Sequence, residues 1–387
     1  MASHRATFAE IDLAAFQHNL KLIRTLIAPG VKVMAVVKAD AYGHGAVPCA
    51  KAAIQAGADC LGVAILEEGM QLRQSGIEVP ILIMASIFPG EVKDLIHHNL
   101  STTLNTEALA EALARQAKNM AKTASVHLKV DTGMGRLGMP PEELIGFVEK
   151  IRSLKNLQVD GIFTHFSSAD EEDPGFTLWQ ISRLNKALEQ LKSAGTSLPR
   201  VHAANSAAIL RFPDSQFDLV RPGIILYGAL PSSVMQPIVA ALRQNNPEHC
   251  FHPVMHWKTK ILQINHVPKG TPLSYNKQFI TQRDSLIATL PAGYADGLSR
   301  NLSNRMQVLV RGQRAPQVGV ICMDLCLIDV TGVKGVQLED EVVFFGKQGK
   351  TMIPVDEMAE RANTISYEIL CTVGKRVPRI YLGLIHK

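Results

Sequence analysis

Lys38 stands directly after VKVMAVV (31–37), a run of mostly apolar residues. Burial lowers the pKa of a lysine because the neutral amine is easier to remove from water than the ammonium. A neutral amine is a nucleophile that forms Schiff bases with carbonyl compounds. The alternative is a structural ammonium held by a salt bridge. Lys38 is therefore a candidate for covalent chemistry on a carbonyl group.

Further polar or small residues recur where β-strands are expected to end. In a barrel of parallel strands these ends open at one mouth, where barrel enzymes hold their reactive groups. Each residue taken singly is an ordinary one for a strand end, but several at one mouth indicate a binding site. The candidates are Lys38, Lys129, Arg136, His165, Asn205, Ser206, Arg221 and Gly223.

Short β-rich runs alternate with helical runs over the first two-thirds of the chain. One helical run, 178–195, places Leu178, Ile181, Leu184, Leu188 and Leu191 on one face. Eight β-then-α units in about 230 residues favour a closed (β/α)₈ TIM barrel over an open doubly wound sheet. The expected strands are 31–38, 60–65, 79–86, 101–106, 125–130, 157–166, 200–205 and 217–224.

Beyond residue 245 the pattern changes to β-branched runs divided by Gly, Pro and Asn, which is typical of an antiparallel sheet. A chain of 387 residues also exceeds what one hydrophobic core usually organises. We therefore expect an α/β protein of two domains, a barrel at 1–245 and a mainly antiparallel β domain at 246–387.

Composition excludes several classes of protein. With 47% hydrophobic and 19% charged residues, the chain is globular and not disordered. The net charge of +5 comes from scattered basic residues, which argues against a nucleic-acid partner. We see no signal peptide and no membrane-spanning run. The six cysteines form no CxxC pair, so we expect no metal site and a cytoplasmic location.

TGMGRLG contains a GxGxxG pattern at Gly133, Gly135 and Gly138, which taken alone indicates dinucleotide binding. That fingerprint requires a helix that begins within the glycines. Pro140 and Pro141 fall where its first turns would form, and the second lacks a needed N–H donor. We therefore do not expect a nicotinamide or flavin cofactor.

A longer series of motifs resembles the alanine racemase family, in order and over essentially the whole chain. The motifs are AVVKADAYGHG, LKVDTGMGRLG, THFSSAD, HAANSAA, RPGIILYG, PLSYNKQF, ATLPAGYADG, CMDLCLIDV and ISYEILC. The resemblance implies a pyridoxal 5′-phosphate enzyme that interconverts L-alanine and D-alanine and supplies D-alanine for peptidoglycan. It also implies a head-to-tail homodimer whose active sites are shared between subunits.

The resemblance assigns two acid/base residues. Lys38 becomes the lysine that attaches the cofactor, and Tyr275 of the partner subunit becomes the second base. Racemisation removes a proton from one face of the α-carbon and returns one to the other, so two groups on opposite faces are sufficient.

The resemblance also assigns the binding residues. Arg221 faces the pyridine nitrogen, and His165 links Arg221 to Tyr275. Arg136 and the partner's Met323 hold the substrate carboxylate, with Asp324 in support. The cofactor, including its phosphate, is held by Tyr42, Asn205, Ser206, Gly223, Ile224 and Tyr367.

Lys129 lies beside Arg136 in this pattern, and two cations in a partly desolvated site repel each other. Carbamylation by carbon dioxide, which occurs in the family, turns the lysine into an anion that orients Arg136. The alternatives are an ordinary lysine paired with Asp131 or another acid, and a bound anion between the two cations.

One departure from the family pattern is Asn276, where glycine is common after the tyrosine. It bears on the local turn and on substrate breadth. A racemase of broader specificity, a barrel decarboxylase and a non-catalytic pyridoxal-phosphate carrier are the other interpretations. The carriers lack the second domain.

Overall fold

The computed structural model describes residues 5–196 and 199–383. Its first part is a parallel sheet of eight strands in the order β8-β7-β6-β5-β4-β3-β2-β9. Two backbone hydrogen bonds close the ring, from Asp218 N to Val201 O (3.1 Å) and from Arg221 N to Ala204 O (2.9 Å). The strands are β2 (Lys32–Val36), β3 (Cys60–Val63), β4 (Ile81–Ile83), β5 (Ser101–Leu104), β6 (Ala124–Lys129), β7 (Leu157–Phe163), β8 (Arg200–His202) and β9 (Leu219–Val220).

The expected barrel is thus confirmed, and each strand leaves the sheet earlier than the sequence suggested. The freed C-terminal ends become the loops of the barrel mouth.

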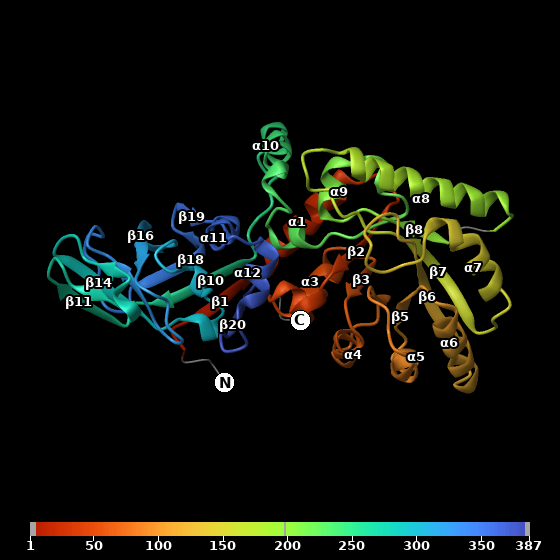
Figure 1. The fold of residues 1–387 in the computed structure, drawn as a ribbon, viewed down its shortest axis with the longest axis horizontal. Coiled ribbons are helices and arrows are strands. Elements are labelled where there is room, and N and C mark those ends of the chain that lie inside the picture. The colour runs from red at the N-terminus through yellow and green to blue at the C-terminus, as the bar shows by residue number, and fades with distance from the viewer. Residues whose placement is uncertain (1–4, 197–198, 384–387) are drawn as a thin grey trace.

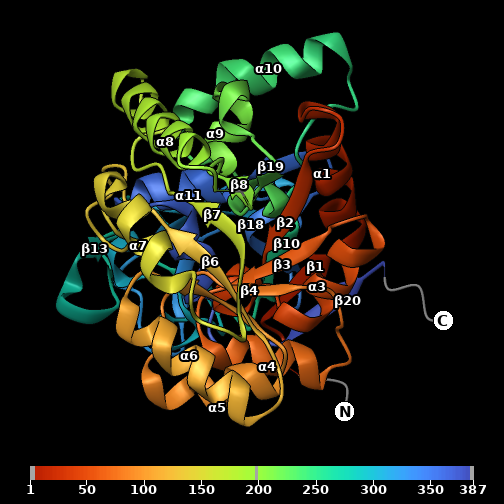
Figure 2. The same ribbon diagram turned by 90° about the vertical axis from the view of Figure 1, so that its right-hand side faces the viewer.

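Helices surround this sheet (Figures 1 and 2). Side-chain caps start some of them: Asp12 accepts from Ala15 N and Thr106 accepts from Leu109 N. In α8 most of the predicted apolar face is buried, but Leu178 is 52% exposed, so that prediction was wrong for this residue. The helices are α1 (Leu13–Leu26), α3 (Ala46–Gln55), α4 (Leu66–Gln74), α5 (Val92–His97), α6 (Glu107–Asn119), α7 (Leu144–Ile151), α8 (Gly175–Ser193), α9 (Ser206–Arg211) and α10 (Gln236–Asn245).

The second part is a mostly antiparallel sheet in the order β11-β14-β17-β16-β15-β18-β10-β1-β20, with β19 on β18. Its strands are β10 (Met255–Lys260), β11 (Gln263–Val267), β14 (Ser285–Leu290), β15 (Gln307–Val310), β16 (Gln313–Val318), β17 (Cys326–Asp329), β18 (Glu341–Gln348), β19 (Thr351–Ile353) and β20 (Arg379–Leu382). β12 (Pro272–Leu273) and β13 (Phe279–Ile280) form a separate hairpin, and α11 (Val355–Ala362) and α12 (Ser366–Thr372) follow β19.

β1 (Phe8–Asp12) was not expected from the sequence. It pairs antiparallel with β10 and parallel with β20, so the N-terminal strand belongs to the second sheet. The domain boundary at residue 245 stays a prediction. Residues 8–12 precede that boundary in the sequence but pair with strands that follow it.

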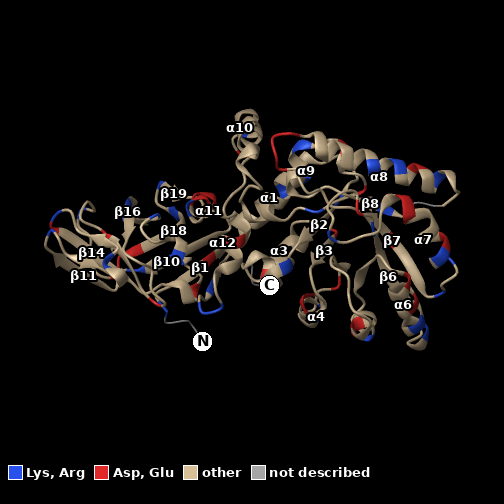
Figure 3. Ribbon diagram, viewed as in Figure 1, with Lys and Arg blue, Asp and Glu red and all other residues tan. Residues whose placement is uncertain are grey.

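One continuous hydrophobic core links the two parts, from the barrel strands to Trp257, Phe344 and Phe345 of the second sheet. No helix within residues 5–196 and 199–383 is long and apolar enough to cross a membrane. Segments with basic and acidic residues are interspersed over both parts (Figure 3). The barrel and the second sheet therefore pack against each other through a shared hydrophobic core.

Candidate active site

Lys38 opens a left-handed turn, α2 (Lys38–Tyr42), which follows β2 at the barrel mouth. The φ angles are 51° at Ala39 and Asp40 and 53° at Ala41 and Tyr42. Left-handed backbone costs roughly 1–2 kcal/mol for each residue with a side chain. Such a turn persists only where the surrounding structure holds it.

Three side chains supply that support. Glu68 accepts from Ala39 N (2.6 Å), and Asp40 accepts from Ala46 N (2.7 Å). The His44 ring donates from Nδ1 to the carbonyl oxygens of Ala41 (2.9 Å) and Tyr42 (3.0 Å). The turn therefore presents Lys38 and Tyr42 in a fixed relation to each other.

Basic side chains converge on this mouth. The pKa of the half-buried Lys38 is lowered, first by burial and then by the charge of Arg136, while Glu68 opposes the shift. The Lys129 amine lies 4.1 Å from the centroid of the Phe163 ring. Burial, followed by the charges of Arg221 and Arg136, holds the pKa of Lys129 well below its ordinary value. Both amines are thereby shifted toward their neutral, nucleophilic form.

Asp131 offers Lys129 no hydrogen-bonded ion pair in the described structure. Its Oδ1 accepts from the N–H groups of Gly133 (2.9 Å), Met134 (2.8 Å) and Gly135 (3.2 Å) instead. These bonds shape the glycine-rich loop, and the next α-helix begins only at Leu144. The loop therefore lacks the helix start that a dinucleotide fingerprint needs.

Arg221 is the central buried cation, 2% exposed. Its Nη2 donates to the carbonyls of Thr164 (2.8 Å) and Ala203 (2.9 Å) and lies 3.3 Å from His165 Nδ1. Its Nη1 lies 3.0 Å from His202 Nδ1. Burial lowers the pKa of Arg221 to about 9, which leaves it cationic at neutral pH. His165 has its pKa held well below the usual range, by burial and then by the charge of Arg221.

A small polar cradle lies between Tyr42 and the start of α9. Ser206 Oγ accepts from Gly223 N (2.9 Å), and a Cβ on Gly223 would lie 2.5 Å from Tyr42 Oη. Only glycine lets the chain approach so closely. The Tyr42 and Tyr367 rings are 5.8 Å apart, and burial raises the pKa of both phenols.

Two predicted cofactor residues lie beside this cradle. Ile224, which follows Gly223, is fully buried. Asn205 caps α9 by accepting from Ala208 N (3.0 Å). Its side chain thereby holds the start of α9, where Ser206 of the cradle lies. Gly223 and Ile224 contribute backbone to the cradle.

Tyr275, Met323 and Asp324 come from the second part of the chain. Tyr275 is 63% exposed, in the 3₁₀ turn η6 (Tyr275–Lys277), and Met323 is 53% exposed. Asn276 has a φ of 58°, which is a left-handed conformation. Glycine adopts this conformation most readily, and asparagine does so more readily than most other residues. Asparagine is therefore compatible with the left-handed backbone of this turn.

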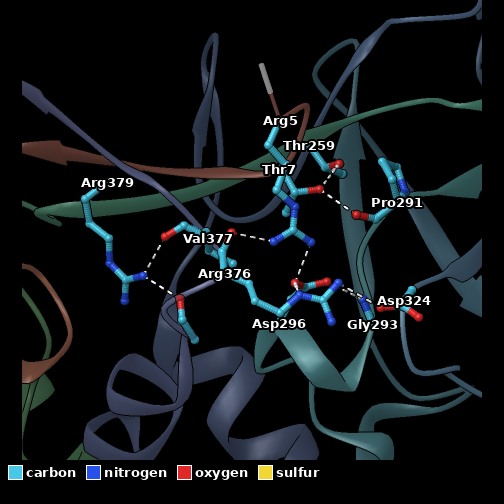
Figure 4. A network of polar contacts seen from close by, with 11 residues as sticks. Arg5, Thr7, Thr259, Pro291, Gly293, Asp296, Asp324, Arg376, Val377 and Arg379 are labelled. Carbon is cyan, nitrogen blue, oxygen red and sulfur yellow. Dashed lines mark hydrogen bonds and ion pairs between the residues drawn. The ribbon is translucent and has the colours of Figure 1, made fainter. Parts of the chain in front are cut away.

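Asp296 links the segments that hold Met323 and Asp324 in place (Figure 4). This fully buried carboxylate contacts Arg5 (2.5 Å) and Arg376 (3.5 Å), and Arg376 also donates to Asp324 (2.8 Å). The neighbouring Ala295 N donates to Met323 O (3.0 Å). Contacts within the single chain therefore hold the turn around Met323 in place.

Sequence reasoning missed Glu68, His44, His127 and His202. Glu68 and His44 hold the turn after Lys38. His202 contacts Arg221, and His127 contacts His202. Only the placement of His127 in a predicted strand, at an even spacing from Lys129, hinted that both side chains point into the barrel.

Fold and site together define a class of protein. It is a (β/α)₈-barrel protein with a partly desolvated lysine, a buried arginine and a small polar cradle at the mouth, joined to a mainly antiparallel β domain.

Comparison with known proteins gives the family within that class. The chain matches the family models "Alanine racemase, N-terminal domain" over residues 11–231 and "Alanine racemase, C-terminal domain" over 254–381. The alanine racemase of Halothermothrix orenii is 45% identical, with 97% of each chain covered. A crystal structure of the Bacillus anthracis alanine racemase with bound L-Ala-P superposes with a TM-score of 0.91 at 36% identity, covering 99% of this chain and 97% of that one. The chain belongs to the alanine racemase family.

Proposed function

We propose that this protein interconverts L-alanine and D-alanine with pyridoxal 5′-phosphate, as a cytoplasmic homodimer. The observation that carries the proposal is the convergence of Lys38, Arg221 and the Gly223 cradle on one barrel mouth in a member of this family. The D-alanine formed is of use in peptidoglycan.

The residues fit this cofactor. Arg221 Nε is buried and has no hydrogen-bond partner within the described structure, while the other two guanidinium nitrogens are engaged. An unpaired buried donor is costly, and a ring nitrogen would satisfy it as an acceptor. Ser206, Tyr42, Tyr367 and the N–H groups at 223–224 would hold the phosphate. When bound, the cofactor supplies an electron-withdrawing ring that stabilises negative charge at the substrate α-carbon.

Each remaining residue has a distinct task. Lys38 would hold the cofactor, and its amine, in the neutral form, would move a proton on one face of the α-carbon. The Tyr275 phenol moves a proton on the other face. Arg221 stays protonated, so it would donate to the ring nitrogen without giving it a full proton, which would restrain side reactions. Arg136 and Met323 N–H would hold the substrate carboxylate.

A homodimer follows from where these groups lie. Tyr275 and Met323 are exposed on the second part of the chain, whereas Lys38 is at the barrel mouth. A second copy that docks its β domain on the mouth supplies both residues, with Asp324 holding the turn through Arg376.

Purified protein loaded with pyridoxal phosphate is expected to convert each alanine enantiomer to the same racemic mixture. A panel of single-enantiomer amino acids, followed by chiral chromatography, measures this and defines the substrate breadth. A higher rate with serine or lysine than with alanine would replace the proposal by a racemase of broader specificity. Binding of the cofactor without any conversion would favour a carrier.

Lys129 is the second lysine for which the site suggests chemistry, and we propose that it is carbamylated. The neutral amine attacks carbon dioxide, an N–C bond forms, and one proton leaves to solvent, which gives a carbamate anion. The new charge neutralises the repulsion between Lys129 and the arginines that lower its pKa. It would also hold Arg136 toward the substrate.

Lys129→Ala is therefore expected to lower activity, and small carboxylates such as acetate should partly restore it by replacing the lost anion. A crystal structure should show planar density of a carboxylate on the Lys129 amine. An ordinary free ammonium in crystals grown with bicarbonate would contradict carbamylation, and so would a failure of acetate to act on Lys129→Ala.

A further inference from the structure

Two buried histidines lie in series behind Arg221. His202 is fully buried and His127 is 5% exposed. His127 Nδ1 lies 2.8 Å from His202 Nε2, and His202 Nδ1 lies 3.0 Å from Arg221 Nη1. Neither ring reaches the mouth groups assigned above to proton transfer. The mechanism therefore leaves this pair without a role.

The strands make a specific place for His127. The register of β6 on β7 shifts between Val126 and His127, so that Asp160 is an extra residue and Gly161 lies opposite His127. A Cβ on Gly161 would lie 2.2 Å from His127 Nδ1. His202 in turn stacks on Phe163, with ring centroids 4.7 Å apart and planes 6° apart. A bulge, a glycine and an aromatic face thus fix both rings.

The order of donors and acceptors along the column follows from Arg221. A guanidinium only donates, so His202 Nδ1 must accept. A neutral His202 then carries its proton on Nε2 and donates it to His127 Nδ1, which leaves the proton of His127 on its own Nε2. The opposite tautomer of His202 would set two donors against each other at 3.0 Å.

Both rings are in the neutral form that this order needs. Burial lowers the pKa of His127 to about 4, with Arg200 and Arg221 adding to the shift and Asp160 opposing it. Burial, and then the charge of Arg221, hold the pKa of His202 well below the usual range. Lys129 and Arg200 are the other charges that act on His202.

We propose that His127 and His202 are positioning residues that fix the orientation of Arg221 through one obligatory tautomer. His127 sets the tautomer of His202, and His202 then accepts from Nη1 so that Nε of Arg221 stays aimed into the mouth. The consequence for the cofactor rests on the proposed function, because Arg221 Nε is the group assigned to its ring nitrogen.

The test uses His127→Asn and His127→Leu in the cofactor-loaded protein. Asparagine keeps an acceptor near the position of Nδ1, whereas leucine keeps the bulk and removes the acceptor. His127→Leu should weaken pyridoxal phosphate binding roughly tenfold and change the cofactor absorption spectrum, because a buried donor loses its partner. His127→Asn should restore both to near wild type.

His256→Leu is the matched control. His256 is also a buried histidine with one ring nitrogen in a hydrogen bond, accepting from Lys347 N (3.0 Å), but it lies in the second sheet on β10. Its loss should lower the melting temperature without a change in the spectrum or in the cofactor affinity. A spectral change in both leucine variants would make the effect one of general stability and overturn the proposal.

Nitrogen-15 NMR of histidine-labelled protein reads the tautomers directly and does not depend on activity. We expect His202 to be protonated at Nε2 alone in the wild type. A proton on His202 Nδ1, a cationic His202, or equal cofactor affinity in His127→Leu and His127→Asn would overturn the proposal. If the wild type racemises nothing but His202 has the expected tautomer, the proposed function fails and the tautomer assignment stands.

Discussion

Replacing Tyr275 with phenylalanine is expected to suppress exchange of the α-proton from L-alanine far more than from D-alanine. The phenol is the proposed acid/base group on one face of the α-carbon, and removal of such a group costs roughly 10²- to 10⁴-fold in rate. The Lys38 amine still serves the other face, so exchange from D-alanine should continue. Solvent-deuterium incorporation into each enantiomer, followed by NMR, measures both rates.

Cofactor retention is the control for this variant. Lys38 is the lysine at the mouth that opens the left-handed turn, so borohydride reduction should fix pyridoxal phosphate on it in Tyr275→Phe as in the wild type. Mass spectrometry after proteolysis identifies the labelled residue. Equal loss of exchange from both enantiomers, or a label on another lysine, would contradict the assigned roles.

Much of the barrel could be predicted from the sequence because each strand is a short apolar run followed by an amphipathic helix. β1 could not, since FAEID is brief and carries two acidic residues, and its partners β10 and β20 lie at the far end of the chain. Leu178 was assigned to the buried face from periodicity alone. It lies in the first turn of α8, where the buried positions are the polar residues Thr177 and Gln180, and a search for apolar spacing does not place polar residues on the buried face.

The candidate site divides in the same way. Lys38, Arg221 and Gly223 stand in local motifs, so sequence reasoning could name them, and the structure brings them to one mouth. The supports of these residues depend on distant contacts or on backbone geometry. His127 and His202 are 75 residues apart, and three of the four residues of the left-handed turn, Ala39, Ala41 and Tyr42, have no special preference for that backbone. No local pattern encodes such features.

Mixing two inactive variants, Lys38→Ala and Tyr275→Phe, is expected to restore activity. In a mixed dimer one mouth combines the intact Lys38 of one chain with the intact Tyr275 of the other, and the second mouth lacks both. Random exchange of subunits places about half of the chains in mixed dimers with one working site of two, so about one quarter of wild-type activity should return. Each variant alone should stay near background.

The exchange itself must be measured apart from activity, for example by mass spectrometry of dimers that pair a tagged with an untagged chain. A double variant, with both substitutions in one chain, mixed with wild type is the matched control. In its mixed dimers each mouth receives one wild-type residue and one substituted residue, because the wild-type chain gives Lys38 to one mouth and Tyr275 to the other. Both mouths are then defective, and mixing should lower activity.

Because Tyr275 is 63% exposed on the β domain and Lys38 lies at the barrel mouth, only a shared site predicts gain in the first mixture and loss in the second. Demonstrated exchange with no recovered activity would leave each chain with a complete site of its own, contrary to this arrangement.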